Sequence, residues 1–116
     1  MRSRFPATRV HYVLADFTQP LDLPLLDGAV MANALHFQRD QLAVLRLIAG
    51  YLRPGGTFLL VEYNTERGNH WIPYPVSYAR WRELAPAAGL ADVAWLGSVP
   101  SRFAGEIYAA VATVPG

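Results

Sequence analysis

The chain alternates short apolar runs with connections that carry proline, glycine or polar residues, a pattern typical of α/β proteins. Residues 9–15, RVHYVLA, form a β-rich run that ends at Asp16, and Pro20 and Pro24 exclude a long helix directly after it. Residues 27–37, DGAVMANALHF, contain a continuous apolar run that is too short for an amphipathic surface helix. We therefore expect a strand there that is buried on both faces, as in parallel sheets.

The next segment predicts a helix followed by another strand. Asp40 can cap this helix, which the stop signal Pro54-Gly55-Gly56 ends. Its apolar residues recur at helical spacing: Leu42, Leu45, Ile48, Ala49 and Leu52. Residues 57–63, TFLLVEY, form the second apolar run, so we expect a right-handed strand, helix, strand unit.

The carboxyl-terminal half predicts a loop, a second helix and two more strands. Residues 64–76, NTERGNHWIPYPV, are polar and aromatic, and long loops in compact domains are often functional. We expect this loop over the carboxyl ends of the strands. Ser77 can cap a helix that ends at Gly89. Residues 92–99 and 106–114 alternate as in strands and predict an antiparallel hairpin.

Composition favours a globular domain over nucleic-acid-binding, disulfide-rich, metal-binding and membrane-spanning proteins. A length of 116 residues with 53% hydrophobic and 16% charged residues suits one globular domain. The net charge is +1, and the ten basic residues are all arginines without a dense stripe, so nucleic acid is not an expected partner. The absence of cysteine excludes disulfides and thiolate metal sites, and His11, His36 and His70 are too dispersed to predict a metal site. No apolar run has the length of a membrane span, so we expect a cytoplasmic protein.

Four segments in this order resemble the carboxyl-terminal portion of class I S-adenosylmethionine-dependent methyltransferases. They are the strand-ending Asp16, LDGAVMANALHF (26–37), LRPGGTFLLVEY (52–63) and LAPAAGLADVAWL (84–96), and the resemblance extends over about residues 9–114. It implies a partial Rossmann-like sheet, mostly parallel with a carboxyl-terminal antiparallel hairpin, and helices packed on it. We expect one truncated domain over residues 1–116.

The same resemblance exposes a missing element. Members of that family begin with a strand, a glycine-rich turn and a second strand whose terminal acid holds the ribose, and this sequence starts after all three. Glycine is needed in that turn because the backbone approaches the cofactor closely. Gly55 and Gly56 precede a strand, whereas ligands of such sheets lie at the carboxyl ends. We expect a chain that is incomplete alone or completed by another chain.

The resemblance implies contacts with S-adenosylmethionine for five residues. Asp16 would accept a hydrogen bond from the adenine amino group, and the Phe17 amide would meet a ring nitrogen. Asn33, Ala34 and Leu35 would border the methionine portion of the cofactor. On the residues alone, Asp16 is equally a turn residue that ends a strand, and Asn33 can simply hydrogen-bond the chain reversal that follows it.

His36 is the candidate catalytic base, because it follows the carboxyl end of a predicted central strand and an imidazole can be neutral near pH 7. The alternative is that it packs against an aromatic neighbour or caps the next helix. Polar and aromatic residues at the end of the next strand, in the loop and at the start of the second helix could bind a flat or apolar small-molecule acceptor. These candidates are Glu62, Tyr63, Asn64, Trp71, Tyr74 and Tyr78. Alternatively, Trp71 and Tyr74 seal one end of the core.

The missing strands would uncover one edge of the strand in residues 27–33, and natural proteins cover such edges. Residues 9–15 could move over to pair there. Alternatively, the same edge of a second copy could complete a two-fold sheet, and we therefore expect a homodimer.

Two functions remain open. One is the acceptor-binding portion of a small-molecule methyltransferase that is inactive as an isolated chain, and the other is a non-catalytic dimerising module that binds no S-adenosylmethionine.

Overall fold

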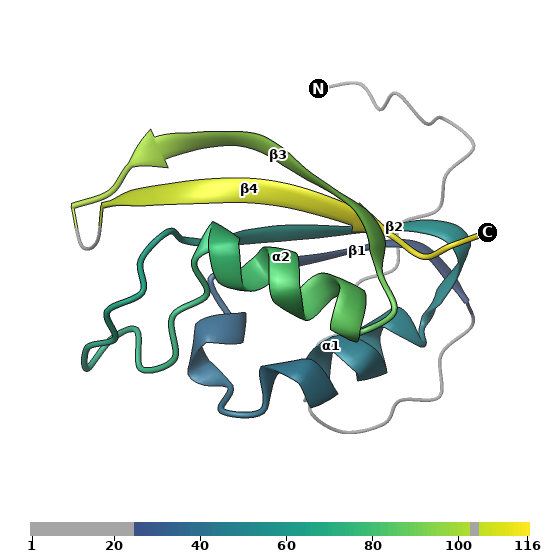
Figure 1. The fold of residues 1–116 in the computed structure, drawn as a ribbon, viewed down its shortest axis with the longest axis horizontal. Coiled ribbons are helices and arrows are strands. Elements are labelled where there is room, and N and C mark those ends of the chain that lie inside the picture. Colours follow the sequence, from purple (N-terminus) through teal and green to yellow (C-terminus); the bar gives the residue numbers. More distant parts are fainter. Residues whose placement is uncertain (1–24, 103–104) are drawn as a thin grey trace.

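The computed structural model of the chain describes residues 25–102 and 105–116. The predicted strand at residues 9–15 and the candidate cofactor residues Asp16 and Phe17 lie outside these ranges. In the described part a four-stranded sheet carries two α-helices on the same face (Figure 1). The elements are β1 (Leu26–Ala32), a 3-10 helix (Leu35–Phe37), α1 (Gln41–Ala49), β2 (Leu52–Tyr63), α2 (Tyr78–Ala87), β3 (Ala91–Pro100) and β4 (Glu106–Thr113).

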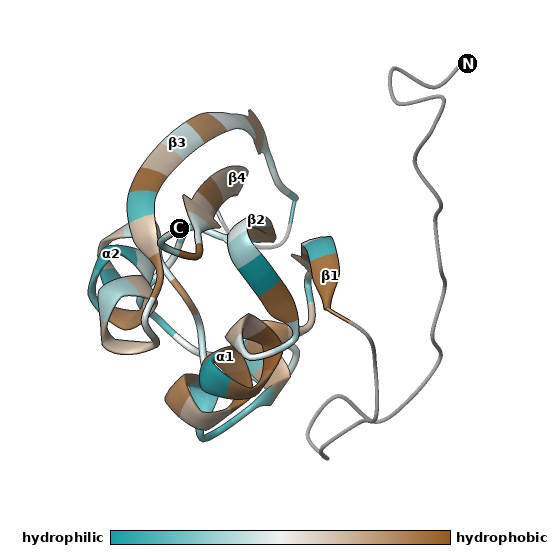
Figure 2. Cartoon of the chain, turned by 90° about the vertical axis from the view of Figure 1, so that its right-hand side faces the viewer, coloured by the Kyte–Doolittle hydropathy of each residue, from teal (hydrophilic) through white to brown (hydrophobic). Residues whose placement is uncertain are grey.

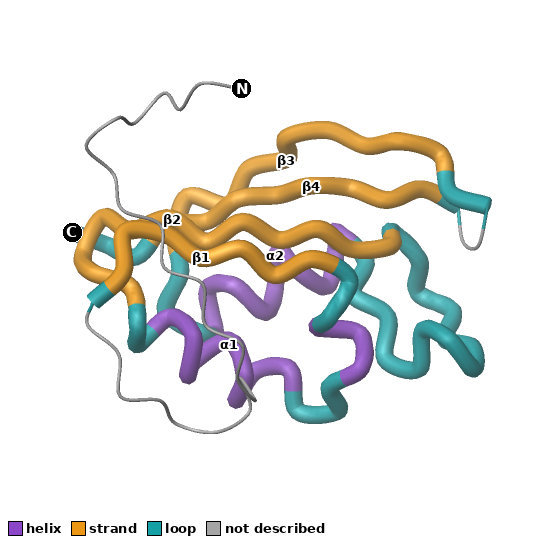
Figure 3. Tube along the Cα trace, turned by 180° about the vertical axis from the view of Figure 1, so that it is seen from behind, coloured by secondary structure: helices purple, strands orange, loops and turns teal. Residues whose placement is uncertain are grey.

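The strands lie in the order β1-β2-β4-β3, which Figure 3 shows from behind. β1 and β2 are parallel and connected through α1, with Val30 beside Leu59. β4 pairs antiparallel with both β2 and β3, and the predicted terminal hairpin is therefore confirmed. The α/β class is confirmed as well. A mostly parallel sheet is not confirmed, because β1 and β2 are the one parallel pair among the described strands.

Both helices begin where the sequence predicts. The Asp40 carboxylate accepts a hydrogen bond from the Ala43 amide (3.1 Å), and the Ser77 hydroxyl accepts one from the Arg80 amide (3.1 Å). These caps satisfy amide groups that have no partner inside the first turn. α2 is followed by Gly89, whose φ of +89° lies in the left-handed region that glycine tolerates. Neither helix of the described chain has the length and apolar character needed to cross a membrane.

The core lies between the helices and the face of the sheet that they cover. Alternate residues of the two central strands point into it: Phe58, Leu60 and Glu62 of β2, and Tyr108, Ala110 and Ala112 of β4. Trp81 of α2 is fully buried and stacks on Phe58 with 5.5 Å between ring centroids. The alternation follows from the two-residue period of a strand, which sends every second side chain to the same face.

The opposite face of the sheet has no helix of the described chain against it, and Figure 2 shows this one-sided arrangement along the sheet. The expectation that the first of the parallel strands is buried on both faces is wrong. In β1 only Met31 is buried, and Val30 is 68% exposed. The reason is its position, because β1 is the outermost described strand on its side and half of its side chains point to the uncovered face.

A matched pair of substitutions tests the position of this core. Phe58→Leu should lower the free energy of unfolding by about 1–2 kcal/mol, because it removes ring contacts with Trp81 inside a packed layer. Phe37→Leu, at a side chain that is 58% exposed, should change it by less than about 0.5 kcal/mol. Urea denaturation followed by circular dichroism measures both. Equal losses would contradict the assigned core.

Candidate functional site

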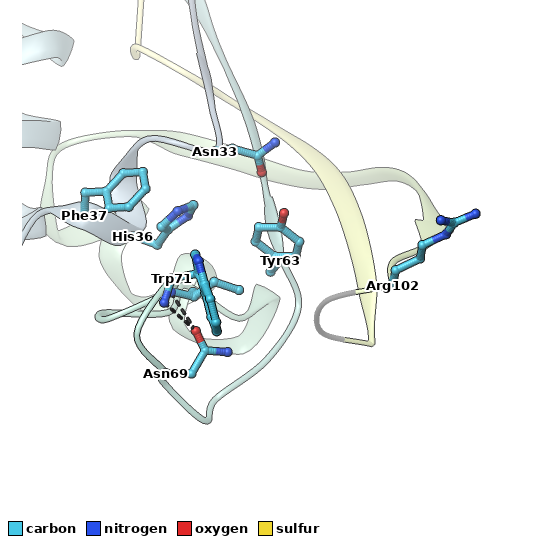
Figure 4. A pocket seen from close by; sticks show the side chains of 8 residues that line it. Asn33, His36, Phe37, Tyr63, Asn69, Trp71 and Arg102 are labelled. Carbon is cyan, nitrogen blue, oxygen red and sulfur yellow. Dashed lines mark hydrogen bonds between the residues drawn. The ribbon is translucent and has the colours of Figure 1, made fainter.

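A cavity of about 430 Å³ lies at the carboxyl ends of β1 and β2, where the loop of residues 64–76 folds against them. Its volume is in the range of small-molecule sites. The lining residues come from the segment after β1, the end of β2, the loop and the turn after β3: Asn33, His36, Phe37, Tyr63, Asn69, Trp71, Ile72 and Arg102. In Figure 4 the Arg102 side chain points away from the others, which surround the space beside His36.

The end of β1 positions His36. The Asn33 amide donates to the Val61 carbonyl (2.8 Å) and continues the pairing with β2 by one residue. Asn33 has a φ of +52°, a left-handed conformation that asparagine tolerates better than most residues. The chain therefore turns sharply into the 3-10 helix, where Leu35 enters the core and His36 is 3% exposed. The His36 ring packs beside Phe37 (4.2 Å between centroids) and Tyr63 (5.8 Å).

Glu62 holds His36 through two hydrogen bonds. His36 Nδ1 lies 2.7 Å from Glu62 Oε1, and the His36 backbone amide donates to Oε2 (3.1 Å). The Tyr63 amide also donates to Oε1 (3.3 Å). Because an ionised carboxylate only accepts, we assign the ring proton to Nδ1, which leaves a lone pair on Nε2 of the neutral ring. A buried acid thus orients a histidine at the wall of the cavity, an arrangement suited to general base catalysis.

Glu62 differs from its predicted role as a substrate contact. It is fully buried and is not among the residues that line the cavity. Sequence analysis did not predict that Glu62 orients His36, although one signal was present. His36 follows the first of two strands predicted to be parallel neighbours, and Glu62 lies near the end of the second. The carboxyl ends of such strands lie at the same edge of a sheet.

Gln41 anchors the loop that closes the cavity. This residue is 2% exposed, and its Nε2 donates to the Tyr74 carbonyl (2.7 Å). Its Oε1 accepts from Arg80 Nε (2.9 Å), and the Tyr74 amide donates to the His36 carbonyl (3.0 Å). The loop is therefore bonded to α1 and to the 3-10 helix, and the same Gln41 side chain joins α1 to α2. Sequence reasoning missed Gln41, because a polar residue in a first helical turn carries no signal of burial.

Asn69 shapes the tip of the loop. Its side-chain oxygen accepts hydrogen bonds from the Trp71 and Ile72 amides, both at 2.8 Å. This turn sends Ile72 inward, where it is 2% exposed, and leaves Trp71 74% exposed at the mouth of the cavity. Ile72 thus has the packing role that was one alternative for Trp71.

Other predicted contacts lie away from the cavity. Asn64 donates to Glu106 Oε2 (2.8 Å) and accepts from the Tyr78 amide (2.9 Å), so it connects two elements. The Tyr78 ring packs edge-on against Trp95, with 5.0 Å between centroids. Tyr74 does not line the cavity, and neither do Ala34 and Leu35. The structure brings together four predicted residues, Asn33, His36, Tyr63 and Trp71, and adds Phe37, Asn69, Ile72 and Arg102.

Tyr108 supports the site from the core. Burial raises its pKa strongly, and the nearby Glu62 and Tyr78 raise it further. Its hydroxyl donates to the Val76 carbonyl (2.7 Å) at the end of the loop. Tyr108 is therefore a neutral donor that fixes the loop and not a second base. In residues 25–102 and 105–116, no group of three or more histidine, cysteine or acidic side chains comes together that could hold a metal ion.

Solved structures with the same fold include a 1,6-didemethyltoxoflavin N1-methyltransferase of Burkholderia thailandensis, solved with bound 1,6-didemethyltoxoflavin and S-adenosylhomocysteine. It is 23% identical, with a TM-score of 0.69, and the match covers 90% of this chain and 50% of that one. The chain has a methyltransferase fold. No protein-family model and no curated protein matches the sequence.

Two further solved structures show that proteins with this fold catalyse different reactions. The O-methyltransferase NcsB1 of neocarzinostatin biosynthesis, solved with S-adenosylhomocysteine and 1,4-dihydroxy-2-naphthoic acid, is 25% identical with a TM-score of 0.56 over 90% of this chain and 33% of that one. The [4+2]-cyclase SpnF is 18% identical with a TM-score of 0.69 over 89% and 55%. The chain thus spans a third to just over half of these proteins. Because a cyclase shares the fold, the reaction must be argued from the site.

Two of the lining residues have side chains whose chemistry is compatible with one end of S-adenosylmethionine. The Asn33 side-chain amide offers both a donor and an acceptor, as an amino acid moiety requires. The aromatic ring of Tyr63 is suited to lie beside a sulfonium cation. The candidates for the adenine end, Asp16 and Phe17, lie outside the described residues, so the fit concerns the methionine end.

A double-mutant cycle tests the His36–Glu62 pair. His36→Leu should lower the free energy of unfolding by about 3–5 kcal/mol, because Glu62 stays buried without its ring donor. The double variant His36→Leu/Glu62→Leu should lose at least about 1 kcal/mol less than the sum of the single losses. Urea denaturation measures all three variants, and additive losses would show that the pair is not coupled.

An isosteric change tests the anchor of the loop. Gln41→Glu replaces the donor to the Tyr74 carbonyl by an acceptor, while Arg80 can still bond to the new carboxylate. Amide exchange at Tyr74 should become about tenfold faster, because the loop opens at a lower free energy cost. Gln38→Glu, at a half-buried position, is the control and should leave this rate unchanged. Equal protection in wild type and Gln41→Glu would contradict the anchoring role.

Proposed function

We propose that this chain supplies the acceptor pocket and the general base of an S-adenosylmethionine-dependent methyltransferase. The proposed acceptor is a small, flat molecule with an acidic O–H or N–H group. The observation that carries this proposal is the buried His36–Glu62 pair at the wall of an aromatic-lined cavity.

The lining supports a flat acceptor. Phe37, Tyr63 and Trp71 contribute three aromatic rings, and rings favour stacked or edge-on contacts with planar partners. Asn69 and Asn33 add amide groups that could fix the orientation of the acceptor. The molecules bound in two similar structures, 1,6-didemethyltoxoflavin and 1,4-dihydroxy-2-naphthoic acid, are flat ring systems.

In this proposal the cofactor supplies an electrophilic methyl group on a sulfonium centre. The chain's own residues bind the acceptor and remove its proton. His36 Nε2 takes the proton from the acceptor's oxygen or nitrogen as that atom gains the methyl group, and Nδ1–H stays bonded to Glu62. The carboxylate stabilises the imidazolium that forms, and water then takes the proton. Aligning the reactants in the cavity supplies much of the acceleration of such a displacement.

The second candidate is a non-catalytic module that self-associates and binds no S-adenosylmethionine. One observation favours it: the outer edge of β1 has no strand partner among the described residues. The two functions differ in whether the chain has affinity for cofactor and acceptor.

Calorimetric titration with 1,4-dihydroxy-2-naphthoic acid tests the acceptor pocket. We expect saturable binding that Trp71→Ala weakens about tenfold, because a stacking surface at the mouth is lost. Trp95→Ala is the matched control and should not change the affinity, since Trp95 packs on Tyr108 away from the cavity. Absence of binding, or equal losses in the two variants, would refute the pocket.

A parallel titration with S-adenosylhomocysteine separates the two functions. Tight binding refutes the inert module. Acceptor binding without S-adenosylhomocysteine binding supports an enzyme whose cofactor turn comes from elsewhere. In an assembly that turns over, His36→Gln should then slow methyl transfer at least about 100-fold while acceptor affinity stays the same.

A further inference from the structure

The permanent charge at the cavity is positive. It belongs to Arg102, whose guanidinium stays protonated at physiological pH, and none of the described lining residues is acidic. The nearby carboxylate of Glu62 is fully buried and accepts hydrogen bonds from His36 and Tyr63. The lining therefore favours a ligand that carries negative charge.

The Arg102 guanidinium is available to such a ligand. Its side chain is exposed, and no ion pair within residues 25–102 and 105–116 engages it. The next acid along the chain, Glu106, is bonded instead to Asn64 Nδ2 (2.8 Å) and to the Ser98 hydroxyl (3.2 Å). A ligand at the cavity thus meets no competing carboxylate of the described chain at this arginine.

The turn that carries Arg102 is held on both sides. Pro100 pairs with Glu106 between β3 and β4, and the Ser101 amide donates to the Gly105 carbonyl (2.9 Å). In Figure 4 the Arg102 side chain extends away from the other lining residues. Because this side chain is exposed and has several rotatable bonds, its head can turn to the mouth of the cavity. Charge-assisted hydrogen bonds to a bound anion offset the entropy that this ordering costs.

We propose that the acceptor is an aromatic hydroxy acid whose carboxylate pairs with Arg102 while its hydroxyl faces His36. The inference rests on the proposed function, because it names the substrate class of the same pocket. Arg102 supplies a single charge and a planar fork that matches a carboxylate. A phosphate group, with about two negative charges at neutral pH, would lack a second cation, since a base at His36 must be neutral.

Glu62 selects the orientation of this acid. Its Oε1 lies 2.7 Å from His36 Nδ1, so a ligand carboxylate beside the ring would bring a second negative charge close to the first. Like charges repel more strongly where protein replaces water. The hydroxyl of the acceptor is neutral until His36 takes its proton, and it avoids this repulsion. The carboxylate is therefore directed to the rim, where Arg102 lies.

Calorimetric titration of the 116-residue chain with 1-hydroxy-2-naphthoate and with 1-naphthol tests the proposal, because the two ligands differ by one carboxylate. We expect Arg102→Gln to weaken binding of the acid about tenfold and to leave binding of 1-naphthol unchanged. Arg67→Gln is the matched control. It removes the same charge from an exposed arginine of the loop that does not line the cavity, and it should change neither affinity.

The outcomes separate this inference from the proposed function. Binding of 1-naphthol without preference for the acid, or equal losses in the two variants, would overturn the role of Arg102 and leave the pocket intact. No binding of either ligand would refute the pocket itself and this inference with it. Raising the ionic strength from about 0.02 to about 0.5 M should weaken binding of the acid alone, since salt screens an exposed ion pair. An affinity for the acid that salt does not change would contradict the pairing.

Discussion

The parallel pairing of β1 with β2 runs from Gly28 beside Thr57 to Ala32 beside Val61 and ends both strands at one edge of the sheet. The pocket depends on this pairing, because it brings the turn after β1 to the last residues of β2. His36 lies 26 positions before Glu62 in the sequence, yet two hydrogen bonds join them. An antiparallel pairing would have placed these residues at opposite ends of the sheet.

Burying the Glu62 carboxylate in the core costs desolvation free energy. Glu62 alternates with Phe58 and Leu60 on the helix-covered side of β2, where a leucine would pack without the cost of desolvating a charge. Three hydrogen-bond donors satisfy the carboxylate, and two of them belong to His36. Since a buried charge with its polar partner adds little net stability compared with apolar replacements, the pair is better explained by the orientation of the ring than by stability.

The two faces of the sheet differ in how deeply their side chains are buried. The covered face holds nearly all fully buried side chains, including Phe58 and Trp81, and supports the cavity from behind. The other face has no helix of the described chain against it and exposes apolar side chains such as Val30, and the outer edge of β1 has no strand partner among the described residues. The cavity at the carboxyl ends of β1 and β2 and the outer edge of β1 are therefore separate parts of one small sheet.

Local signals in the sequence determined the order of elements, the helix starts at Asp40 and Ser77, and the terminal hairpin, because caps and turns depend on hydrogen bonds between residues a few positions apart. They also identified His36 and Trp71, since a histidine after a strand and aromatic residues in a long loop can be recognised without coordinates. Only the tertiary structure decided that Glu62 orients His36, that Gln41 anchors the loop and that β1 is exposed. These features depend on which distant segments pack together, and no local pattern carries that information.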